Sequence, residues 1–392
     1  TDIFSEQLHP DNITEQQHRR QHAVDSASLP HYDELDEYVT IHKVRLLRHE
    51  GDEMVSSKDV ARLAGVSQST VSRVLNHAPN VSPETRQKVL SAIGQLQYTP
   101  NLIARSLVTR STKTIALISG TLRNGFFVET TDAIVNYATA RGYQTMVYFK
   151  EDGLDEVFDL VLGSKVDGLL LATIELDDPL WEKIDRSRIP CVFFNRKPRE
   201  GGNYVIFDNQ LAAELVANHL LELGHERIAF LCGNTNVSTF HDRKVGFEKA
   251  MEAACVKIDP ALVHVFDPKI PGEVEKYARK LMHMAHPPSA IFCSTDMIAL
   301  LCMDAVMAMG YRIPEDVSVA GIDNISISAH QAIQLTSAGH AKFNLGELAV
   351  EYLIEMIEQE EKPTEWKQIT LKPELFVRRT TARKGERSGA SR

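Results

Sequence analysis

The sequence predicts an α/β protein in which a small all-helical domain precedes a larger part built from doubly wound parallel sheets. Residues 57–96 hold apolar positions at helical spacing in three short segments that turn residues separate. From residue 114 onward, short apolar runs alternate with amphipathic stretches, which is typical of strands alternating with helices. About 265 residues are many for one such sheet, so we expect two similar lobes.

The ends of the first two helices are marked by residue type. Ser57 is placed where an N-cap opens a helix, and Asp59 adds negative charge to the first turn. Gly65 suits the left-handed exit of that helix, and Ser67 can cap a second helix after a three-residue turn. The apolar residues of the second helix share one side, and its polar residues share the other: Val71, Val74 and Leu75 against Gln68, Ser69, Ser72 and Arg73.

The polar side of the second helix fits a DNA major groove. Glutamine can pair bidentately with adenine and arginine with guanine, so Gln68 and Arg73 are candidates for base contacts. Residues 54–113 hold eight Lys and Arg against two Asp and Glu, although the net charge of the chain is -10. This local excess of positive charge favours phosphate contacts. An amphipathic helical hairpin in an ordinary core is the alternative interpretation.

A third helix and a short fourth segment follow. Ser82 and Pro83 supply a cap and a first-turn residue, and the expected buried stripe is Val89, Leu90, Ile93 and Leu96. Residues 101–109 follow Thr99 and Pro100, and they place Ala104 and Leu107 on one face. Nine residues are too few to sustain a helix alone, so we expect this segment to order only with a partner.

In this order, DVARLAGVSQSTVSRVLN, VSPETR and YTPNLIARSL resemble the DNA-binding domain and hinge of the lactose/galactose repressor family of bacterial transcription regulators. The resemblance is nearly continuous over residues 58–107. It implies base contacts by Gln68, Ser69 and Arg73 and phosphate contacts by Ser67, Thr70 and Asn76. It also implies that the hinge, with Ala104 and Leu107, enters the minor groove, where an apolar wedge bends the duplex.

Later segments extend the resemblance to the effector domain of the same family, which is similar to periplasmic sugar-binding proteins. They include VDGLLL, STDMIAL, IPEDVSVAGIDN and LFVRRTT. The expected domains are a DNA-binding domain at 54–100, a hinge at 101–112 and a two-lobed effector-binding and dimerisation domain at 113–380, followed by a flexible tail at 381–392. Residues 1–53 are polar and predicted to be disordered. Because Met54 stands where the family's initiator would be, they are either an upstream extension outside the working protein or a regulatory tail.

Seven apolar runs predict strands of the two lobes: TIALIS, YQTMVYF, DGLLLAT, PCVFF, RIAFLCG, SAIFCS and VSVAGID. The chain is expected to cross between the lobes near Ile206, Asn324 and Lys342. The cleft between the lobes is the predicted ligand site, because open α/β sheets bind ligands at the carboxyl ends of their strands.

The resemblance also implies which residues contact the effector. Phe126 and Phe127 would place an aromatic ring against it, and Phe266 would stack on it, whereas the polar contacts would come from Asn195, Thr239, Arg243 and Asp296. Arg243 and Asp296 stand out, because a charge at a strand end that faces a cleft requires a partner. Phe127 is equally consistent with an ordinary core position, and Asn195 with a turn.

The sequence argues against an enzyme, a cofactor and a metal site. Gly120 and Gly125 have the spacing of a phosphate-binding loop, but Phe126 replaces its lysine. The five cysteines form no CxxC pair, so we predict no zinc site or disulfide but buried free thiols in a reducing cytoplasm. Without a run of 18 apolar residues or a signal peptide, the chain is expected to be soluble, cytoplasmic and without a membrane partner.

We therefore expect a homodimer that binds a near-palindromic double-stranded operator and acts as a repressor more readily than as an activator. A small molecule in the cleft, a sugar or sugar derivative, would shift the lobes and change DNA affinity. Sugar phosphates and purines remain open as effectors, and so do induction and corepression. The alternative is a ligand-binding sensor protein without a role in transcription.

Overall fold

The computed structural model describes residues 55–75, 78–98, 111–150, 153–340, 344–359 and 365–385. The chain divides into two compact units, Thr1–Thr99 and Pro100–Arg392. The expectations for residues 1–53, for Asn76, for Ala104 and Leu107 in the hinge, and for the tail after residue 385 lie outside the described residues.

The described residues of the first unit form three helices, α2 (Ser57–Ala64), α3 (Gln68–Leu75) and α4 (Pro83–Gln95). They share a core that includes Val60, Val71, Val74, Val89 and Ala92. Ser82 caps α4 and accepts a hydrogen bond from the Thr85 amide, as the sequence predicts. The expected stripe on α4 is wrong at one position, because Leu90 is 50% exposed and Ala92 is buried in its place.

The start of α2 also differs from the expectation. Ser56, not Ser57, is the N-cap, and the Asp59 carboxylate accepts hydrogen bonds from the Ser56 amide at 3.1 Å and hydroxyl at 2.6 Å. The cap therefore lies three residues before the acid that reaches back to it. Gly65 ends the helix with a φ of 64°, in the left-handed region that the sequence predicts for this exit.

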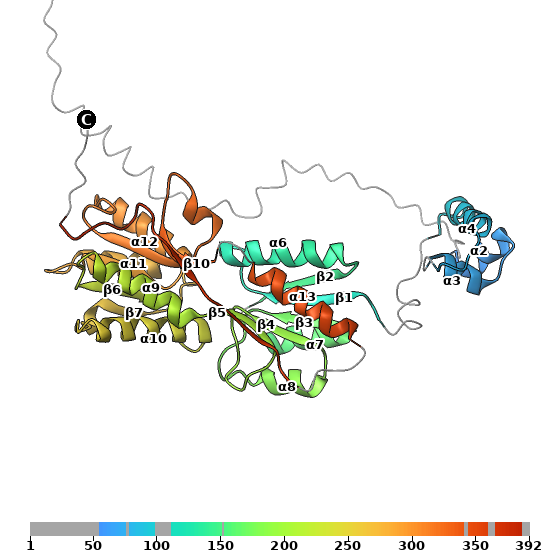
Figure 1. Cartoon of the computed structure of the whole chain (residues 1–392), viewed down its shortest axis with the longest axis horizontal. Coiled ribbons are helices and arrows are strands. Elements are labelled where there is room, and N and C mark those ends of the chain that lie inside the picture. Colours follow the sequence, from blue (N-terminus) through green and yellow to red (C-terminus); the bar gives the residue numbers. More distant parts are fainter. Residues whose placement is uncertain are drawn as a thin grey trace, which may run out of the picture. The chain divides into compact units, whose positions relative to one another are not determined.

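The second unit has two lobes, each built on a six-stranded sheet (Figure 1). The first lobe has the strand order β11-β5-β4-β3-β1-β2, and every pairing is parallel. Its strands are β1 (Thr114–Ser119), β2 (Gln144–Phe149), β3 (Gly168–Leu171), β4 (Cys191–Phe194), β5 (Tyr204–Phe207) and β11 (Gln368–Leu371). Helices α6 (Gly125–Ala140) and α13 (Leu345–Glu358) cover one face, and α7 (Leu154–Gly163) and α8 (Leu180–Ser187) cover the other.

The second lobe repeats this plan with the order β12-β10-β9-β8-β6-β7, in which only β12 is antiparallel to its neighbour. Its strands are β6 (Ile228–Cys232), β7 (Val263–Val265), β8 (Ala290–Cys293), β9 (Ser318–Asp323), β10 (Thr336–Gly339) and β12 (Glu374–Phe376). Helices α9 (Asn209–Glu222) and α10 (Ser238–Ala253) cover one face, and α11 (Glu273–Met282) and α12 (Asp296–Ala308) the other; two short 3-10 helices are η2 (Pro260–Leu262) and η3 (Ser326–Ala329).

The likeness of the two lobes extends to single residues. Gly120 follows β1, and the Phe127 ring occupies the space that a Cβ on this glycine would need. Gly233 follows β6, and Phe240 fills the equivalent space there. In both lobes a phenylalanine seven residues after the glycine thus packs against the end of the first strand.

The seven strands predicted from apolar runs are confirmed, but one crossing point is wrong. The chain crosses after β5, close to the expected Ile206, and again between β10 and α13, where Lys342 lies outside the described residues. The third crossing joins β11 to β12, because Asn324 is followed by β10 in its own lobe. The prediction of buried thiols also fails at Cys255, which is exposed, whereas the other four cysteines are buried and free.

Candidate DNA-binding surface and effector cleft

Helix α3 turns its apolar side to the three-helix core and its polar side to solvent. Val71 and Val74 are buried, whereas Gln68, Ser69 and Arg73 are exposed. The Gln68 amide nitrogen donates a hydrogen bond to the Ser57 hydroxyl at 2.7 Å, which ties the first turns of α3 and α2 together. Arg73 lies in the last turn of α3 and places a long cationic side chain on the exposed face.

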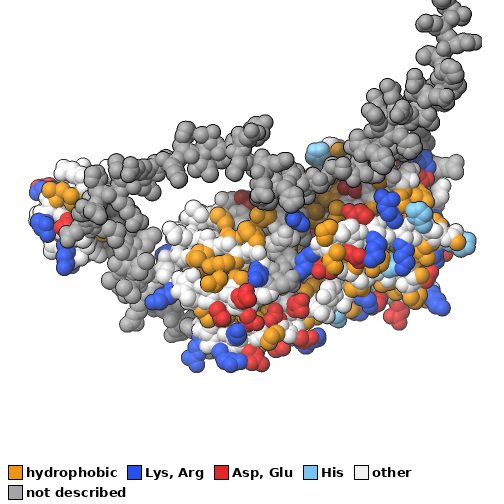
Figure 2. Space-filling model, turned by 180° about the vertical axis from the view of Figure 1, so that it is seen from behind, with side chains coloured by type: hydrophobic (Ala, Val, Ile, Leu, Met, Phe, Trp, Pro, Cys, Tyr) orange, Lys and Arg blue, Asp and Glu red, His pale blue; other side chains and the backbone are white. Residues whose placement is uncertain are grey.

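The first turn of α3 is organised around Ser67. Its hydroxyl accepts a hydrogen bond from the Thr70 amide at 3.1 Å and lies 2.7 Å from the Ser69 hydroxyl and 2.9 Å from that of Thr70. These exposed hydroxyls stand at a helix N-terminus, where backbone amides favour anions such as phosphate. Figure 2 shows blue Lys and Arg side chains with few red acidic ones on the visible face of this unit.

Among the described residues of the second unit, two cavities that lie between the lobes share the residues Phe126 and Asp323. The larger cavity has a volume of about 560 Å³, and the smaller one about 40 Å³. Phe126 comes from the first turn of α6 in the first lobe, and Asp323 from the end of β9 in the second. Together the cavities form the interlobe cleft.

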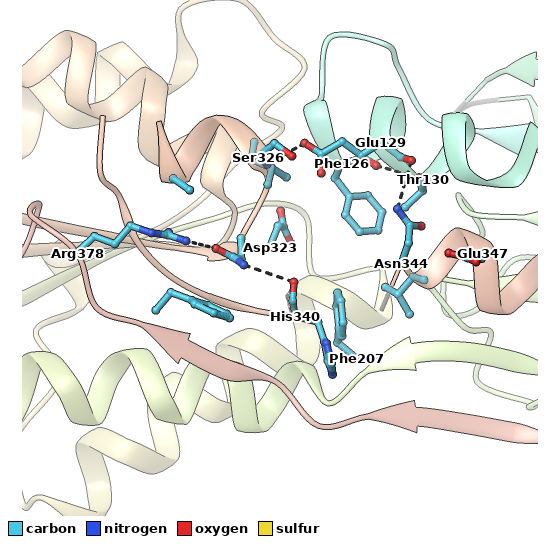
Figure 3. A pocket seen from close by; sticks show the side chains of 15 residues that line it. Phe126, Glu129, Thr130, Phe207, Asp323, Ser326, His340, Asn344, Glu347 and Arg378 are labelled. Atoms are coloured by element: carbon cyan, nitrogen blue, oxygen red, sulfur yellow. Dashed lines mark hydrogen bonds between the residues drawn. The ribbon is translucent and has the colours of Figure 1, made fainter. Parts of the chain in front are cut away.

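The larger cavity combines aromatic rings with acidic side chains (Figure 3). The Phe207 ring stacks on the His340 ring with a centroid distance of 6.3 Å, and the Phe126 ring lies above this pair in the same view. Acidic side chains lining it come from Glu129, Asp323 and Glu347, and Arg378 brings a guanidinium. Arg378 donates to the Leu335 carbonyl at 2.6 Å and to the Asn324 side chain, and burial lowers its pKa.

Arg243 and Asp323 form an ion pair of 2.7 Å at the small cavity. Arg243 is 1% exposed, and its other two nitrogens donate to the Asn209 side chain at 2.9 Å and to the Ser294 carbonyl at 2.5 Å. Burial raises the pKa of Asp323 to about 7, although Arg243 acts to lower it. A buried charge requires such a partner, because removal from water is costly.

The backbone at Asp323 is unusual for a residue with a side chain. Asp323 has a φ of 127° and Asn324 a φ of 51°. Gly339 on β10 approaches this turn so closely that a Cβ there would lie 2.7 Å from the Asp323 carbonyl oxygen. Strained positions of this kind are found at functional sites more often than elsewhere, so the turn makes Asp323 a candidate site residue.

The structure places Asp296 behind the cleft, where it lines neither cavity. It is fully buried, and one carboxylate oxygen accepts from the Ser337 hydroxyl at 2.6 Å. The other oxygen accepts from the Ser328 hydroxyl at 2.7 Å and the Ile325 amide at 3.1 Å. Asp296 therefore needs no ligand as its partner, contrary to the expectation from its place after a strand, because the turn after β9 and strand β10 supply its partners. Burial raises the pKa of Asp296.

The other expected effector residues fall into two groups. Phe126, Phe127, Asn195, Thr239 and Arg243 line the smaller cavity. Phe127 is also part of the core of the first lobe, in agreement with its alternative interpretation. Phe266 is 7% exposed, belongs to the core of the second lobe, stacks on Tyr277 at 5.0 Å and lines neither cavity.

Hydrogen bonds join the lobes on both sides of the cleft. The Thr239 hydroxyl donates to the Asn195 carbonyl at 3.1 Å, and the Lys197 amide donates to the Ser238 hydroxyl at 3.0 Å. Across the larger cavity, the Ser326 amide donates to the Glu129 carboxylate at 2.8 Å. A change in the angle between the lobes must exchange these contacts.

Sequence reasoning missed Asp323, His340 and Arg378 as site residues. A usable signal for Asp323 was the motif GIDN at the end of β9, in which an acid directly follows an apolar strand. His340 and Arg378 follow short strands that the apolar runs did not reveal. Arg378 lies in the segment LFVRRTT, whose resemblance to the family's effector domain was the available signal for it. Within the described residues there is no group of three or more potential metal ligands, and no helix there is long and apolar enough to span a membrane.

A helix-turn-helix unit followed by a two-lobed α/β unit with a polar interlobe cleft defines a class of DNA-binding proteins that respond to a ligand. Residues 57–101 match the model of the bacterial regulatory proteins of the lacI family, and residues 217–381 match a periplasmic binding protein-like domain. The chain belongs to the lacI family of transcription regulators.

Curated relatives include the HTH-type transcriptional repressor PurR of Haemophilus influenzae strain PittEE, 34% identical over 334 residues that cover 83% of this chain and 98% of the relative. PurR of Photobacterium profundum is also 34% identical, with the same shares covered. Among solved structures, the Lac repressor dimer bound to operator and the anti-inducer ONPF has a TM-score of 0.74 at 26% identity and covers 84% of this chain and 99% of that one. The transcriptional regulator CelR with cellobiose has a TM-score of 0.62 at 29% identity over 83% and 99%.

Proposed function

We propose that this protein represses transcription as a homodimer on a near-palindromic operator, and that a neutral sugar in the interlobe cleft controls its affinity for DNA. The observation that carries the ligand assignment is the lining of the larger cavity, in which aromatic rings stand beside carboxylates. The assembly follows the Lac repressor, which is solved as a dimer on its operator.

On the DNA side, the exposed face of α3 supports the roles expected from the sequence. Gln68, Ser69 and Arg73 read base edges, and Ser67, Thr70 and Asn76 contact phosphates. Gln68 already donates to Ser57, so it meets a base through its free oxygen or after exchanging this partner. Ala104 and Leu107 enter the minor groove, which is a role for residues outside the described ranges.

On the ligand side, the charges of the cleft disfavour an anion. Glu129, Asp323 and Glu347 bring three carboxylates to the lining, of which Asp323 is paired with Arg243. The described arginines of the cleft, Arg196, Arg243 and Arg378, all donate within the protein. A phosphate would meet repulsion without an uncommitted guanidinium, whereas sugar hydroxyls can donate to carboxylates and sugar rings can pack on aromatic faces. The CelR neighbour, which is solved with cellobiose, agrees with a neutral sugar.

A thermal-shift panel of neutral mono- and disaccharides, sugar phosphates and purines tests the ligand assignment, since a ligand that binds only the folded state raises the melting temperature. We expect shifts with neutral sugars that the Glu347→Gln and Phe126→Ala variants reduce. Glu374→Gln is a matched control, because Glu374 lies on β12 and does not line the cavity. A shift with sugar phosphates or purines alone would overturn the assignment.

A further inference from the structure

The chain enters the first lobe at residues 111–113, directly after the segment that joins the two units, and Asp167 holds it there. Asp167 precedes β3, and its carboxylate accepts four hydrogen bonds from these three consecutive residues. The donors are the Ser111 hydroxyl at 2.5 Å, the Thr112 amide at 2.8 Å and hydroxyl at 2.9 Å, and the Lys113 amide at 2.9 Å. The Asp167 amide in turn donates to the Thr114 carbonyl at 2.8 Å.

Lys113 makes a second attachment. Its ammonium group donates to the Glu358 carboxylate at 3.1 Å and to the Tyr143 hydroxyl at 3.0 Å, and it lies 4.2 Å from the centre of the Tyr143 ring. Its backbone has a φ of 49°, a left-handed conformation that a residue with a side chain adopts at a cost. Neighbouring contacts must maintain this turn, and Asp167 and Glu358 provide them.

Glu358 connects this attachment to the effector cleft. It is the last residue of α13, whose first residue, Leu345, lines the larger cavity. The 14 residues of this helix span about 20 Å. Helix α6 runs beside α13: it carries Phe126 at its cavity end, and Arg141, directly after its other end, lies 3.6 Å from Glu358.

The two helices are in close contact. Gly346 of α13 lies so near α6 that a Cβ there would be 2.5 Å from the Thr130 carbonyl oxygen. The Asn344 side chain donates to the Glu129 carbonyl at 3.3 Å. Both helices thus begin at the cavity and end at the group that holds Lys113, and packing this tight leaves little room for one to slide against the other.

We propose that Asp167 and Glu358 form a clamp on residues 111–113 that fixes where the joining segment leaves the first lobe and thereby sets operator affinity. The effect of this clamp on affinity presupposes the operator binding proposed above. Asp167 and Glu358 act through the linker and do not touch DNA, so they are positioning residues. While Asp167 and Glu358 hold residues 111–113, helices α6 and α13 connect the cleft to the point where the joining segment leaves the first lobe.

The experiment uses the full chain and two duplexes of equal length, one selected from a random pool by the wild-type protein and one unselected. In Asp167→Asn, the new side-chain NH2 group is itself a hydrogen-bond donor, so it cannot accept from all the donors of residues 111–113. Glu358→Gln removes the ion pair with Lys113. Asp155→Asn is the control, because it removes an exposed acid of the same lobe that pairs with Lys183 at 2.6 Å. Trypsin cleavage after Lys113 reports directly on whether the attachment is closed.

For Asp167→Asn and Glu358→Gln we expect faster trypsin cleavage after Lys113. We also expect affinity for the selected duplex to fall by about ten-fold, which is the size of effect that mutations between two coupled sites have. Affinity for the unselected duplex and cleavage in Asp155→Asn should match the wild type. Faster cleavage with unchanged affinity for the selected duplex would overturn the proposal, and so would unchanged cleavage in both variants. If the wild type selects no duplex, operator binding itself fails, which is a separate result.

Discussion

Arg243 and Asp323 of the second lobe meet in an ion pair of 2.7 Å at the smaller cavity of the cleft, and Asp323 also lines the larger cavity. Arg243 lies on α10, and Asp323 ends β9 in a strained turn. A ligand that enters the cleft must either fit around this pair or exchange its contacts. We therefore expect occupation of the cleft to change the geometry of the second lobe through this pair.

Loss of Arg243 should destabilise the second unit strongly. Above pH 7, where the Asp323 carboxylate is charged, Arg243→Met leaves this charge buried without its partner, which costs about 3–5 kcal/mol in the free energy of unfolding. Urea unfolding of the full chain measures this loss. Arg199→Met is the control, because Arg199 pairs with Asp177 on the surface, where a salt bridge contributes about 0–1 kcal/mol. Equal losses in the two variants would refute a structural role for the buried pair.

The raised pKa of Asp323 predicts that stability falls as the pH rises. Burial shifts this pKa from the ordinary 3.8 to about 7, so between these values the folded state holds a proton that the unfolded state has released. The stabilisation is complete below the unfolded pKa and is lost as the pH rises through 7, by about 1 kcal/mol per pH unit between roughly pH 5 and 7. Asp323→Asn should reduce this slope in calorimetry, leaving the part that Asp296 contributes in the same direction. An unchanged slope would show that Asp323 does not titrate in this range.

Arg73→Ala should relax sequence selectivity. A bidentate arginine contact with guanine contributes about 1–3 kcal/mol of discrimination at one base pair. Fluorescence anisotropy with the operator and with a duplex changed at single positions measures the loss. Lys88→Ala removes a cation from α4 and is the control, since it should leave the ratio of operator to random-duplex affinity unaltered. If Arg73→Ala kept the wild-type ratio, α3 would not be the recognition helix.

The two serines at the start of α2 should differ in their effect on the DNA-binding unit. Ser56→Ala removes the N-cap hydroxyl and should lower stability by about 1 kcal/mol. Ser57→Ala removes only an exposed partner of Gln68 and should change stability less. Thermal unfolding followed by circular dichroism at equal salt compares the two variants. A larger loss of stability in Ser57→Ala would show that Ser57 is the N-cap, as expected from the sequence.

The sequence predicted those parts of the fold that local pattern determines. Seven strands were recognisable because they are continuous apolar runs, and the end of α2 because Gly65 permits a left-handed exit. The apolar runs did not include β5, β7, β10, β11 and β12, each of which has only three or four residues. Strands β11 and β12 are also edge strands of partly exposed residues. The buried stripe of α4 was misplaced at Leu90, since several faces of this helix carry apolar residues.

The site was harder to predict, because its chemistry depends on contacts between distant residues. Asp296 and Asp323 each lie at the carboxyl end of a strand, so their positions in the sequence are alike. They differ because Ser328 and Ser337, from 32 and 41 residues away, satisfy Asp296, whereas Asp323 meets Arg243 at the cavity. Only the fold brings these partners together, and no local pattern separates the two acids.

The central claim is that occupation of the interlobe cleft changes the affinity of this protein for its operator. The most direct measurement is an anisotropy titration of operator duplex with the full chain at fixed salt, without and with a saturating neutral sugar chosen by its thermal shift. We expect the sugar to change operator affinity by about five-fold or more and to leave affinity for random duplex unchanged. In Phe126→Ala the sugar should no longer change operator affinity. Identical operator affinity with and without a sugar that demonstrably fills the cleft would contradict it.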